Sequence, residues 1–242
     1  MHIPKTAGTS MRTFLESKYC SKVIDAQNIL ANKHKLKDTD FISGHLHLPV
    51  LCSLIDKNDW NIITTFRNPY SYVVSHLCWV RKAVDPGQES RLKSDPAPFV
   101  KIAHKMKEHN FADPNELDIF ISWLESENMF FFHDTQTRYL LSPAYDRMLQ
   151  PQELHEAETN FNTIDYVGDS SRLDEFQNAI SSIFGWKLNT NASMSNSNSK
   201  RYGIDLDNPD TRNALDRLVQ FDKYIYDMAT LAHNRLVLDP SS

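Results

Sequence analysis

The first ten residues combine a cation, hydroxyl groups and small side chains in an order that suits anion binding. A strand that ends, turns tightly and enters a helix leaves backbone N–H groups and the positive end of the helix dipole facing the turn. Lys5 adds a mobile positive charge to this turn, and the hydroxyl groups of the following residues add hydrogen-bond donors. We therefore predict that a phosphate or sulfate ester binds at a loop made of Lys5, Thr6, Ala7, Gly8, Thr9 and Ser10.

A second candidate anion site follows a short strand further along the chain. Residues 61–66 are rich in β-branched side chains, which predicts a buried strand, and Pro69 suits the first turn of a helix. Arg67 then lies at the carboxyl end of the strand, where open α/β sheets bind ligands, and Ser75 lies on the helix. A guanidinium grips a phosphate through two parallel hydrogen bonds, and a serine hydroxyl adds a third. Ser75 has one alternative role, which is to bond back to the preceding helical turn.

Both motifs resemble those of sulfotransferases. Residues 3–10, IPKTAGTS, resemble the 5′-phosphosulfate loop of that family, and residues 65–75, TFRNPYSYVVS, resemble its 3′-phosphate motif. Further similarity to the membrane-type carbohydrate branch, which includes heparan sulfate 2-O-sulfotransferase, is found at residues 43–45, 135–140 and 166–176. The resemblance extends from residue 3 to about residue 230.

The resemblance implies an enzyme that uses 3′-phosphoadenosine 5′-phosphosulfate (PAPS) as the sulfate donor and releases PAP. The loop of residues 5–10 would bind the 5′ end of the nucleotide, while Arg67 and Ser75 would bind the 3′-phosphate. Lys5 would neutralise the charge on the leaving phosphate. A metal is unnecessary for this transfer, and we expect none. In relatives a loop closes over the nucleotide, and here that loop would contain Ser199, Lys200 and Arg201. The alternative is a basic loop that does not contact the nucleotide.

A histidine is the expected proton acceptor. His45 follows the strand Phe41–Ser43 and a glycine, so it should emerge at the carboxyl end of the sheet. An imidazole with a pKa of about 6.5 suits a general base near neutral pH. The family's His-Gly-His is replaced here by Ser43-Gly44-His45, which keeps the second histidine, a catalytic base in the family. His47 is the alternative base or a contact to the acceptor.

Two further residues match a family motif on the acceptor side. Gln136 and Arg138 lie in that motif, and the resemblance implies that they bind the acceptor, a saccharide with a free hydroxyl group. Arg138 is equally compatible with a structural ion pair. Tyr72 and Trp79 lie two helical turns apart, as a buried stripe would. We expect them to pack in the core rather than form a sugar platform, together with Tyr70, Trp123 and residues 130–132.

The order of predicted elements indicates an α/β fold. Strands and helices alternate in the front third of the chain, which is typical of a parallel sheet with crossover helices. We expect one domain over residues 1–242, a P-loop-like three-layer sandwich with a central parallel sheet flanked by helices, the sulfotransferase fold. Residues 84–162 would add a helical elaboration on the acceptor side. Because only residues 1–3 precede Pro4, we expect either a very short first strand or a chain that begins earlier.

Composition narrows the class of protein. A net charge of −5 argues against a protein that coats nucleic acid or an anionic membrane. No stretch is apolar for long enough to span a membrane. The 3 cysteines show no metal-ligand spacing, so we expect reduced thiols and a cytoplasmic, bacterial-type enzyme; removal of an N-terminal anchor would instead suit the Golgi lumen.

Two other functions compete with the sulfotransferase. A P-loop kinase needs its lysine after the last glycine and an aspartate after a hydrophobic strand, whereas residues 60–67 end in arginine. A non-catalytic module that binds PAPS or PAP would keep Lys5 and Arg67 but need no base, and the replaced histidine at Ser43 leaves this alternative open.

Overall fold

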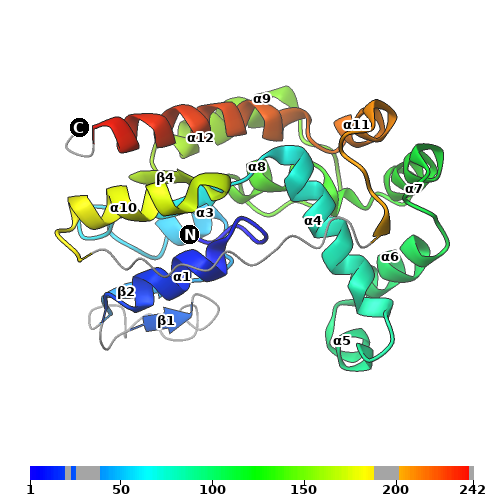
Figure 1. Cartoon of the computed structure of the whole chain (residues 1–242), viewed down its shortest axis with the longest axis horizontal. Coiled ribbons are helices and arrows are strands. Elements are labelled where there is room, and N and C mark those ends of the chain that lie inside the picture. The colour runs from blue at the N-terminus through cyan, green and yellow to red at the C-terminus, as the bar shows by residue number, and fades with distance from the viewer. Residues whose placement is uncertain (20–22, 26–38, 188–201, 240–242) are drawn as a thin grey trace.

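The computed structural model describes residues 1–19, 23–25, 39–187 and 202–239, so the predicted loop residues Ser199, Lys200 and Arg201 lie outside the described residues. The fold is α/β and mostly helical (Figure 1). The strands are β1 (Val23–Asp25), β2 (Phe41–Ser43), β3 (Ile63–Phe66) and β4 (Tyr166–Asp169). The helices are α1 (Gly8–Glu16), α3 (Leu48–Cys52), α4 (Pro69–Arg81), α5 (Glu89–Ser94), α6 (Ala97–Lys107), α7 (Pro114–Ser126), α8 (Thr135–Tyr139), α9 (Pro151–Phe161), α10 (Leu173–Ile183), α11 (Pro209–Asp216) and α12 (Gln220–Leu238). Short 3-10 turns are η2 (Lys82–Val84), η3 (Phe130–Phe132) and η4 (Ser170–Arg172).

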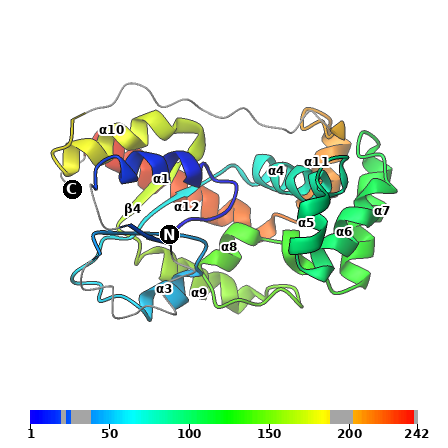
Figure 2. The same cartoon turned by 90° about the horizontal axis from the view of Figure 1, so that it is seen from below.

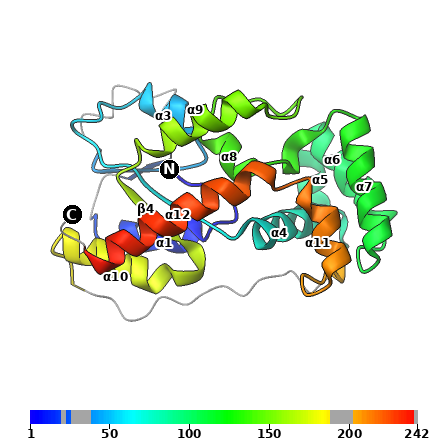
Figure 3. The same cartoon turned by 90° about the horizontal axis from the view of Figure 1, so that it is seen from above.

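The strands are parallel, as predicted, but in the described part of the chain they form two pairs instead of one continuous sheet. Strand β1 pairs with β2, with Val23 opposite Phe41, and β3 pairs with β4, with Ile63 opposite Tyr166. Helices cover the strands from both sides: in Figure 2, α1 and α10 lie on one side of β4, and α3 and α9 lie on the other. Helix α12 packs directly on β4, which it crosses in Figure 3.

The first residues of the chain bridge the two pairs of strands. The backbone N–H of His2 donates to the carbonyl oxygen of Gly44, just after β2, at 3.0 Å. The Met1 ammonium group donates to the carbonyl oxygen of Ile63 in β3 at 2.9 Å. Ile3 follows with no exposed surface. These few residues therefore take the place of the short first strand and deliver the chain to the predicted anion loop.

The hydrophobic core has one part around the strands and another in a helical region at one end of the molecule. The helical part is built by α4, α6, α7 and α11, and these elements gather at the right of Figure 1. Residues 84–162 divide between the two parts. Helices α6 and α7 join the helical region, whereas Tyr139 of α8 and Phe161 of α9 pack with Phe66 of β3.

Local sequence explains where the central helix α4 begins. Pro69 is its first residue, and the Asn68 side chain accepts a hydrogen bond from the Ser71 backbone N–H at 3.2 Å. This satisfies one of the free N–H groups at the start of the helix. Arg67 is thereby held between the last residue of β3 and the cap of α4. None of the described helices is both long and apolar enough to cross a membrane.

Two buried carboxylates tie the short helix α8 to the start of α12. Asp134 accepts hydrogen bonds from the backbone N–H groups of Phe221 at 2.7 Å and Asp222 at 3.1 Å. Asp222 in turn accepts from the backbone N–H groups of Gln136 at 3.2 Å and Thr137 at 2.7 Å. Each carboxylate thus satisfies free N–H groups at the start of the other's helix. The pair fixes where α8 lies, and with it the side chain of Gln136.

The Asp134 carboxyl should make stability depend on pH. Burial and the neighbouring Asp222 raise the pKa of Asp134 from 3.8 to about 7. The folded protein therefore holds a proton that the unfolded chain releases between these two values, and the stability from that proton is lost as the pH rises through about 7. Asp134→Asn keeps an acceptor oxygen but does not titrate. We expect the free energy of unfolding of the variant, relative to that of the wild type, to increase by about 1–3 kcal/mol as the pH rises from about 5 to about 8.

Urea unfolding at several pH values measures this difference. The matched control is the same substitution at an exposed aspartate, Asp146→Asn. A difference for Asp134→Asn that stays constant over the same range would contradict the assignment.

Candidate functional site

The predicted anion loop is a tight turn with an unusual backbone. Lys5 and Ala7 both have left-handed conformations, with φ values of 66° and 60°. Such conformations are uncommon outside glycine and cluster where structure serves a function. The first hydrogen bond of α1 runs from Met11 to the carbonyl oxygen of Ala7 at 3.0 Å. The N–H groups of residues 8–10 therefore have no acceptor in the helix and are available to an anion.

Two buried threonines, Thr6 in the loop and Thr65 in β3, stabilise the conformation of the loop. Thr6 is fully buried, and its hydroxyl group donates to the carbonyl oxygen of Ile3 at 2.9 Å. The hydroxyl group of Thr65, in β3, donates to the carbonyl oxygen of Thr6 at 2.6 Å. The Thr6 side chain, which we expected to face the anion, therefore stabilises the loop in this structure. Thr9 is exposed and Ser10 is half-buried at the start of α1.

His45 lies beside the loop in a form suited to accept a proton. Its Nδ1 is 2.8 Å from the carbonyl oxygen of His2, and its ring lies 4.2 Å from the His2 ring. A carbonyl oxygen only accepts, so Nδ1 carries the hydrogen and the neutral ring has its lone pair on Nε2. His45 is exposed, and the His2 ring in turn packs against Gly8, where an added Cβ would lie 1.7 Å from it. The predicted base is thus joined to the predicted anion loop.

The backbone of Arg67 is fixed by hydrogen bonds to Gln136, while its guanidinium forms no ion pair with a carboxylate among the described residues. Its N–H donates to Gln136 Oε1 at 2.8 Å, and its carbonyl oxygen accepts from Gln136 Nε2 at 2.9 Å. Its guanidinium donates from Nη1 to the carbonyl oxygen of Lys5 at 3.2 Å. No ion pair of Arg67 with an acidic side chain is found among the described residues. Burial lowers the pKa of Arg67, but a guanidinium remains charged, so this cation is short of negative charge.

The surroundings of Ser75 and Gln136 bear on the roles that the sequence predicts for them. Ser75 is buried on α4 at 9% exposure, and within the described part of the chain its hydroxyl does not bond back to the helix. Gln136 is only 1% exposed, and both ends of its amide serve the Arg67 backbone. Gln136 was predicted to contact the acceptor, whereas its geometry makes it a positioning residue for Arg67.

His47 is a scaffold residue in this structure. Its Nδ1 lies 2.8 Å from the carbonyl oxygens of both Arg138 and Leu141, and its Nε2 accepts from the Tyr145 hydroxyl at 2.9 Å. Burial lowers the pKa of His47. Because both ring nitrogens are occupied, the geometry favours His45 as the base.

Arg138 is buried and donates hydrogen bonds to main-chain carbonyl oxygens. It is 1% exposed, and its guanidinium donates to the carbonyl oxygens of His133 at 2.7 Å and Arg147 at 2.8 Å, and also to that of Ala144. Neither an acceptor contact nor a direct ion pair describes this arrangement. The side chain instead holds the loop that follows α8.

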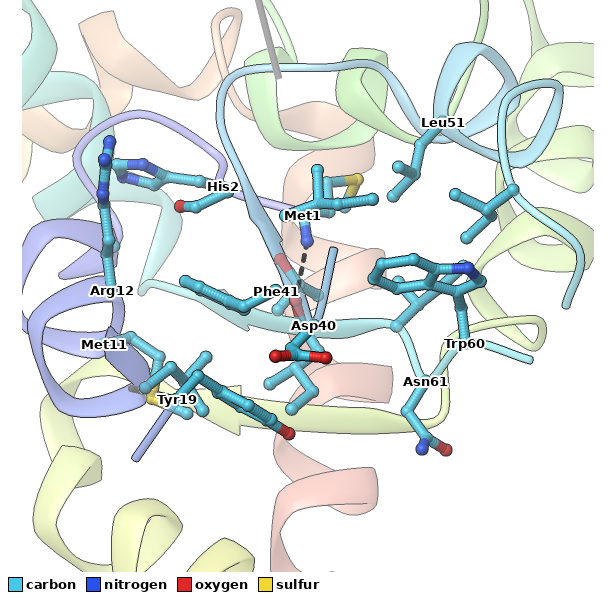
Figure 4. A pocket seen from close by; sticks show the side chains of 18 of the residues that line it. Met1, His2, Met11, Arg12, Tyr19, Asp40, Phe41, Leu51, Trp60 and Asn61 are labelled. Atoms are coloured by element: carbon cyan, nitrogen blue, oxygen red, sulfur yellow. Dashed lines mark hydrogen bonds between the residues drawn. The ribbon is translucent and has the colours of Figure 1, made fainter. Parts of the chain in front are cut away.

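A cavity of about 180 Å³ lies between β2 and β3, behind the anion loop (Figure 4). Its lining extends from Asp40 and Asn61, which precede these strands, to Ser43 and Thr65 near their carboxyl ends. Arg67 follows the carboxyl end of β3 and does not line this cavity. The cavity therefore touches the anion loop at Gly8 but does not include Arg67.

Comparison of this chain with protein-family models, with curated proteins and with solved structures finds no match in any of the three. Any function must therefore be argued from the site itself. Over the described ranges, no group of three or more His, Cys, Asp or Glu side chains could hold a metal ion. What the structure brings together is the loop of residues 5–10, Arg67 and His45, whereas no hydrogen bond among the described residues joins Ser75 of α4 to them.

If the Arg67 guanidinium binds an anion, replacing Arg67 should increase the stability of the protein and weaken anion binding. Arg67→Met removes a partly buried charge that has no counter-ion but keeps most of the side-chain volume. We expect the free energy of unfolding to rise by about 1 kcal/mol or more. Inorganic sulfate should raise the melting temperature of the wild type by more than that of the variant, which keeps the loop of residues 5–10.

Thermal unfolding over a sulfate titration measures both effects. Arg147→Met, at an exposed arginine paired with Glu153, is the control and should keep the response to sulfate. An Arg67→Met protein that is less stable than the wild type and is stabilised by sulfate to the same extent would rule out the anion role.

Proposed function

We propose that this protein is a PAPS-dependent sulfotransferase that transfers a sulfuryl group to a hydroxyl group of a carbohydrate. The observation that carries the proposal is Arg67, a half-buried guanidinium with no carboxylate partner among the residues described, joined by a hydrogen bond to the carbonyl oxygen of Lys5. This bond links the two predicted phosphate sites. PAPS carries negative groups at both its 5′ and 3′ ends, which fits two linked anion sites better than a single phosphate does.

Each part of the site has a role in the proposed reaction. The N–H groups of residues 8–10 and the Lys5 ammonium would bind the phosphosulfate, and Arg67 with Ser75 would bind the 3′-phosphate. The bond between sulfur and the bridging phosphate oxygen breaks as the acceptor oxygen bonds to sulfur. The acceptor proton passes to His45 Nε2, and PAP leaves with its charge neutralised by Lys5. Positioning and charge stabilisation supply most of the rate, as in phosphoryl transfer.

The fold is compatible with the proposed P-loop-like sandwich. Parallel strand pairs bridged by residues 1–2, with helices on both sides, deliver the loop, His45 and Arg67 to the same end of the strands. That end is where open α/β sheets bind nucleotides.

Calorimetry and a transfer assay test the proposal. PAP should bind more tightly than ATP with magnesium, and label from PAPS should appear on a member of a saccharide panel. A preference for ATP with magnesium would favour the kinase and sink the proposal. Tight binding of PAP without transfer to any acceptor would favour the non-catalytic module.

His45 variants should lose turnover while keeping the nucleotide. His45→Asn retains a side-chain N–H for the His2 carbonyl oxygen but has no basic nitrogen at the Nε2 position. We expect turnover to fall by ~10²–10⁴-fold, with PAP affinity nearly unchanged, as measured by labelled transfer and calorimetry. His155→Ala, at a side chain with 84% exposure, is the control. An equal loss of PAP binding in His45→Asn would contradict the division of roles.

Gln136 variants should act through Arg67. Gln136→Ala removes both hydrogen bonds to the Arg67 backbone, so the guanidinium loses its fixed position. We expect PAP affinity to fall by ~10-fold or more in calorimetry, because two buried hydrogen bonds are lost. The Arg67→Met background provides the check: there, Gln136→Ala should cause little further loss, and a full additional loss would show that Gln136 acts independently.

A further inference from the structure

The cavity between β2 and β3 is bordered by two strand edges (Figure 4). In the described part of the chain, β2 pairs with β1 alone and β3 pairs with β4 alone, so each of these two strands has one edge without a partner strand. Such an edge presents backbone N–H and C=O groups and is a template for pairing with a further strand. The question is whether the space between the two edges fits one.

Residues 1 and 2 already have the hydrogen bonds of a strand end between these edges. The Met1 nitrogen donates to the carbonyl oxygen of Ile63 in β3 at 2.9 Å. The next nitrogen along the chain, that of His2, donates to the carbonyl oxygen of Gly44, just after β2, at 3.0 Å. Donation from successive residues to opposite neighbours is the pattern of a central strand. At this point β2 and β3 are therefore two strand spacings apart, each of about 4.8 Å.

The alternation of backbone groups along a strand identifies those that border the cavity. The carbonyl oxygen of Ile62 accepts a hydrogen bond from β4, so the backbone of Ile63 faces the other way, and so does that of Thr65, two residues on. On the opposite edge, Gly44 faces His2, so the backbone of Ile42 faces the cavity as well. Ile42, Ile63 and Thr65 all line the cavity. A strand placed there finds hydrogen-bond partners on both sides.

The side chains above and below the cavity are apolar. Met11 and Leu15 of α1 line it, and so do Leu51 of α3 and Ile55, which follows α3. Helices α1 and α3 lie on opposite sides of the strands (Figure 2). A strand covered on both faces carries apolar, β-branched residues in succession instead of alternating polar and apolar ones. These surroundings therefore suit an apolar peptide segment.

The Met1 amino group is placed where a peptide N–H would fit better. It is buried, and burial lowers its pKa to about 6. Burying a charged amine carries a desolvation cost, which a neutral amide largely avoids. An amide at the same position would make the same hydrogen bond to the Ile63 carbonyl oxygen.

We propose that this cavity accepts one further parallel strand, an apolar segment of about four residues joined to the Met1 nitrogen by a peptide bond. The added strand unites the two strand pairs in one sheet, in the order β1, β2, added strand, β3, β4. It continues directly into residues 1–3 and so supports the anion loop from behind, whatever ligand the loop binds.

Two extensions of equal length test the proposal by thermal unfolding. One joins the β-forming segment Lys-Thr-Val-Ile-Val to Met1, and the other joins the flexible segment Lys-Gly-Ser-Gly-Ser. Both remove the charged amine from the cavity, so their difference isolates the strand. We expect the β-forming extension to give a melting temperature ~5 °C or more above that of the flexible one, because it buries apolar side chains. Amide exchange at Ile42 and Thr65 should slow by ~10-fold or more with the β-forming extension alone.

A proline variant separates strand pairing from apolar burial. The segment Lys-Thr-Val-Pro-Val stays apolar, but proline lacks an N–H group and is not accommodated in a central strand, so most of the gain should be lost. Equal melting temperatures for the β-forming and flexible extensions would overturn the proposal, as would an equal gain with the proline segment. Sedimentation supplies the last check: wild-type dimers with Ile42 and Thr65 amides already protected would assign the cavity to a second copy of the chain instead. Because no nucleotide is involved, these outcomes are independent of the proposed function.

Discussion

The two hydrogen bonds between the Gln136 amide and the Arg67 backbone are the contact on which the candidate site depends. They join α8 to the carboxyl end of β3, and Gln136 is too buried for water to replace them. On one side of this contact, Asp222 holds the start of α8, and Asp134 holds Asp222. On the other side, the Arg67 guanidinium reaches the carbonyl oxygen of Lys5. A series of hydrogen bonds thus connects the core to the anion loop, and these bonds fix the position of the Arg67 guanidinium.

The same end of β3 collects features that cost stability. Arg67 is short of a counter-ion, and Lys5 and Ala7 adopt left-handed conformations without being glycine. The His76 Nδ1 is buried without a hydrogen-bond partner in the described part of the chain. Any one of these features occurs occasionally in a stable protein. Together, around one loop, they describe a protein surface preorganised for a ligand that brings negative charge and hydrogen-bonding groups, because such a ligand offsets several of the costs at once.

Local signals predicted part of this arrangement and tertiary contacts decided the rest. The β-branched run before Arg67 and the proline after it placed Arg67 at a strand end before a helix, and α4 does begin at Pro69. Gln136 was expected at the acceptor because of its motif, but its partner is the main chain of Arg67, 69 residues away, which no local pattern encodes. Arg138 shares the motif, and it bonds instead to carbonyl oxygens only 5 to 9 residues away. Trp79 has the spacing of a buried residue, but its side chain is 39% exposed because neighbouring elements cover it only in part. The two strand pairs also join through residues 1–2, a segment too short to have any periodicity.

His45 and His47 show how small a difference in position separates a reactive group from a structural one. Both follow β2, and both place Nδ1 against a main-chain carbonyl oxygen, which fixes the same tautomer in each ring. They differ at Nε2, which in His47 accepts from the Tyr145 hydroxyl and in His45 faces the exposed side of the loop. The tautomer alone therefore does not make a base; the open second nitrogen does. Because the His2 carbonyl that orients His45 belongs to the segment bridging β2 and β3, the same backbone that feeds the anion loop also orients the base. In the proposed reaction, one short piece of chain would therefore position both donor binding and proton removal.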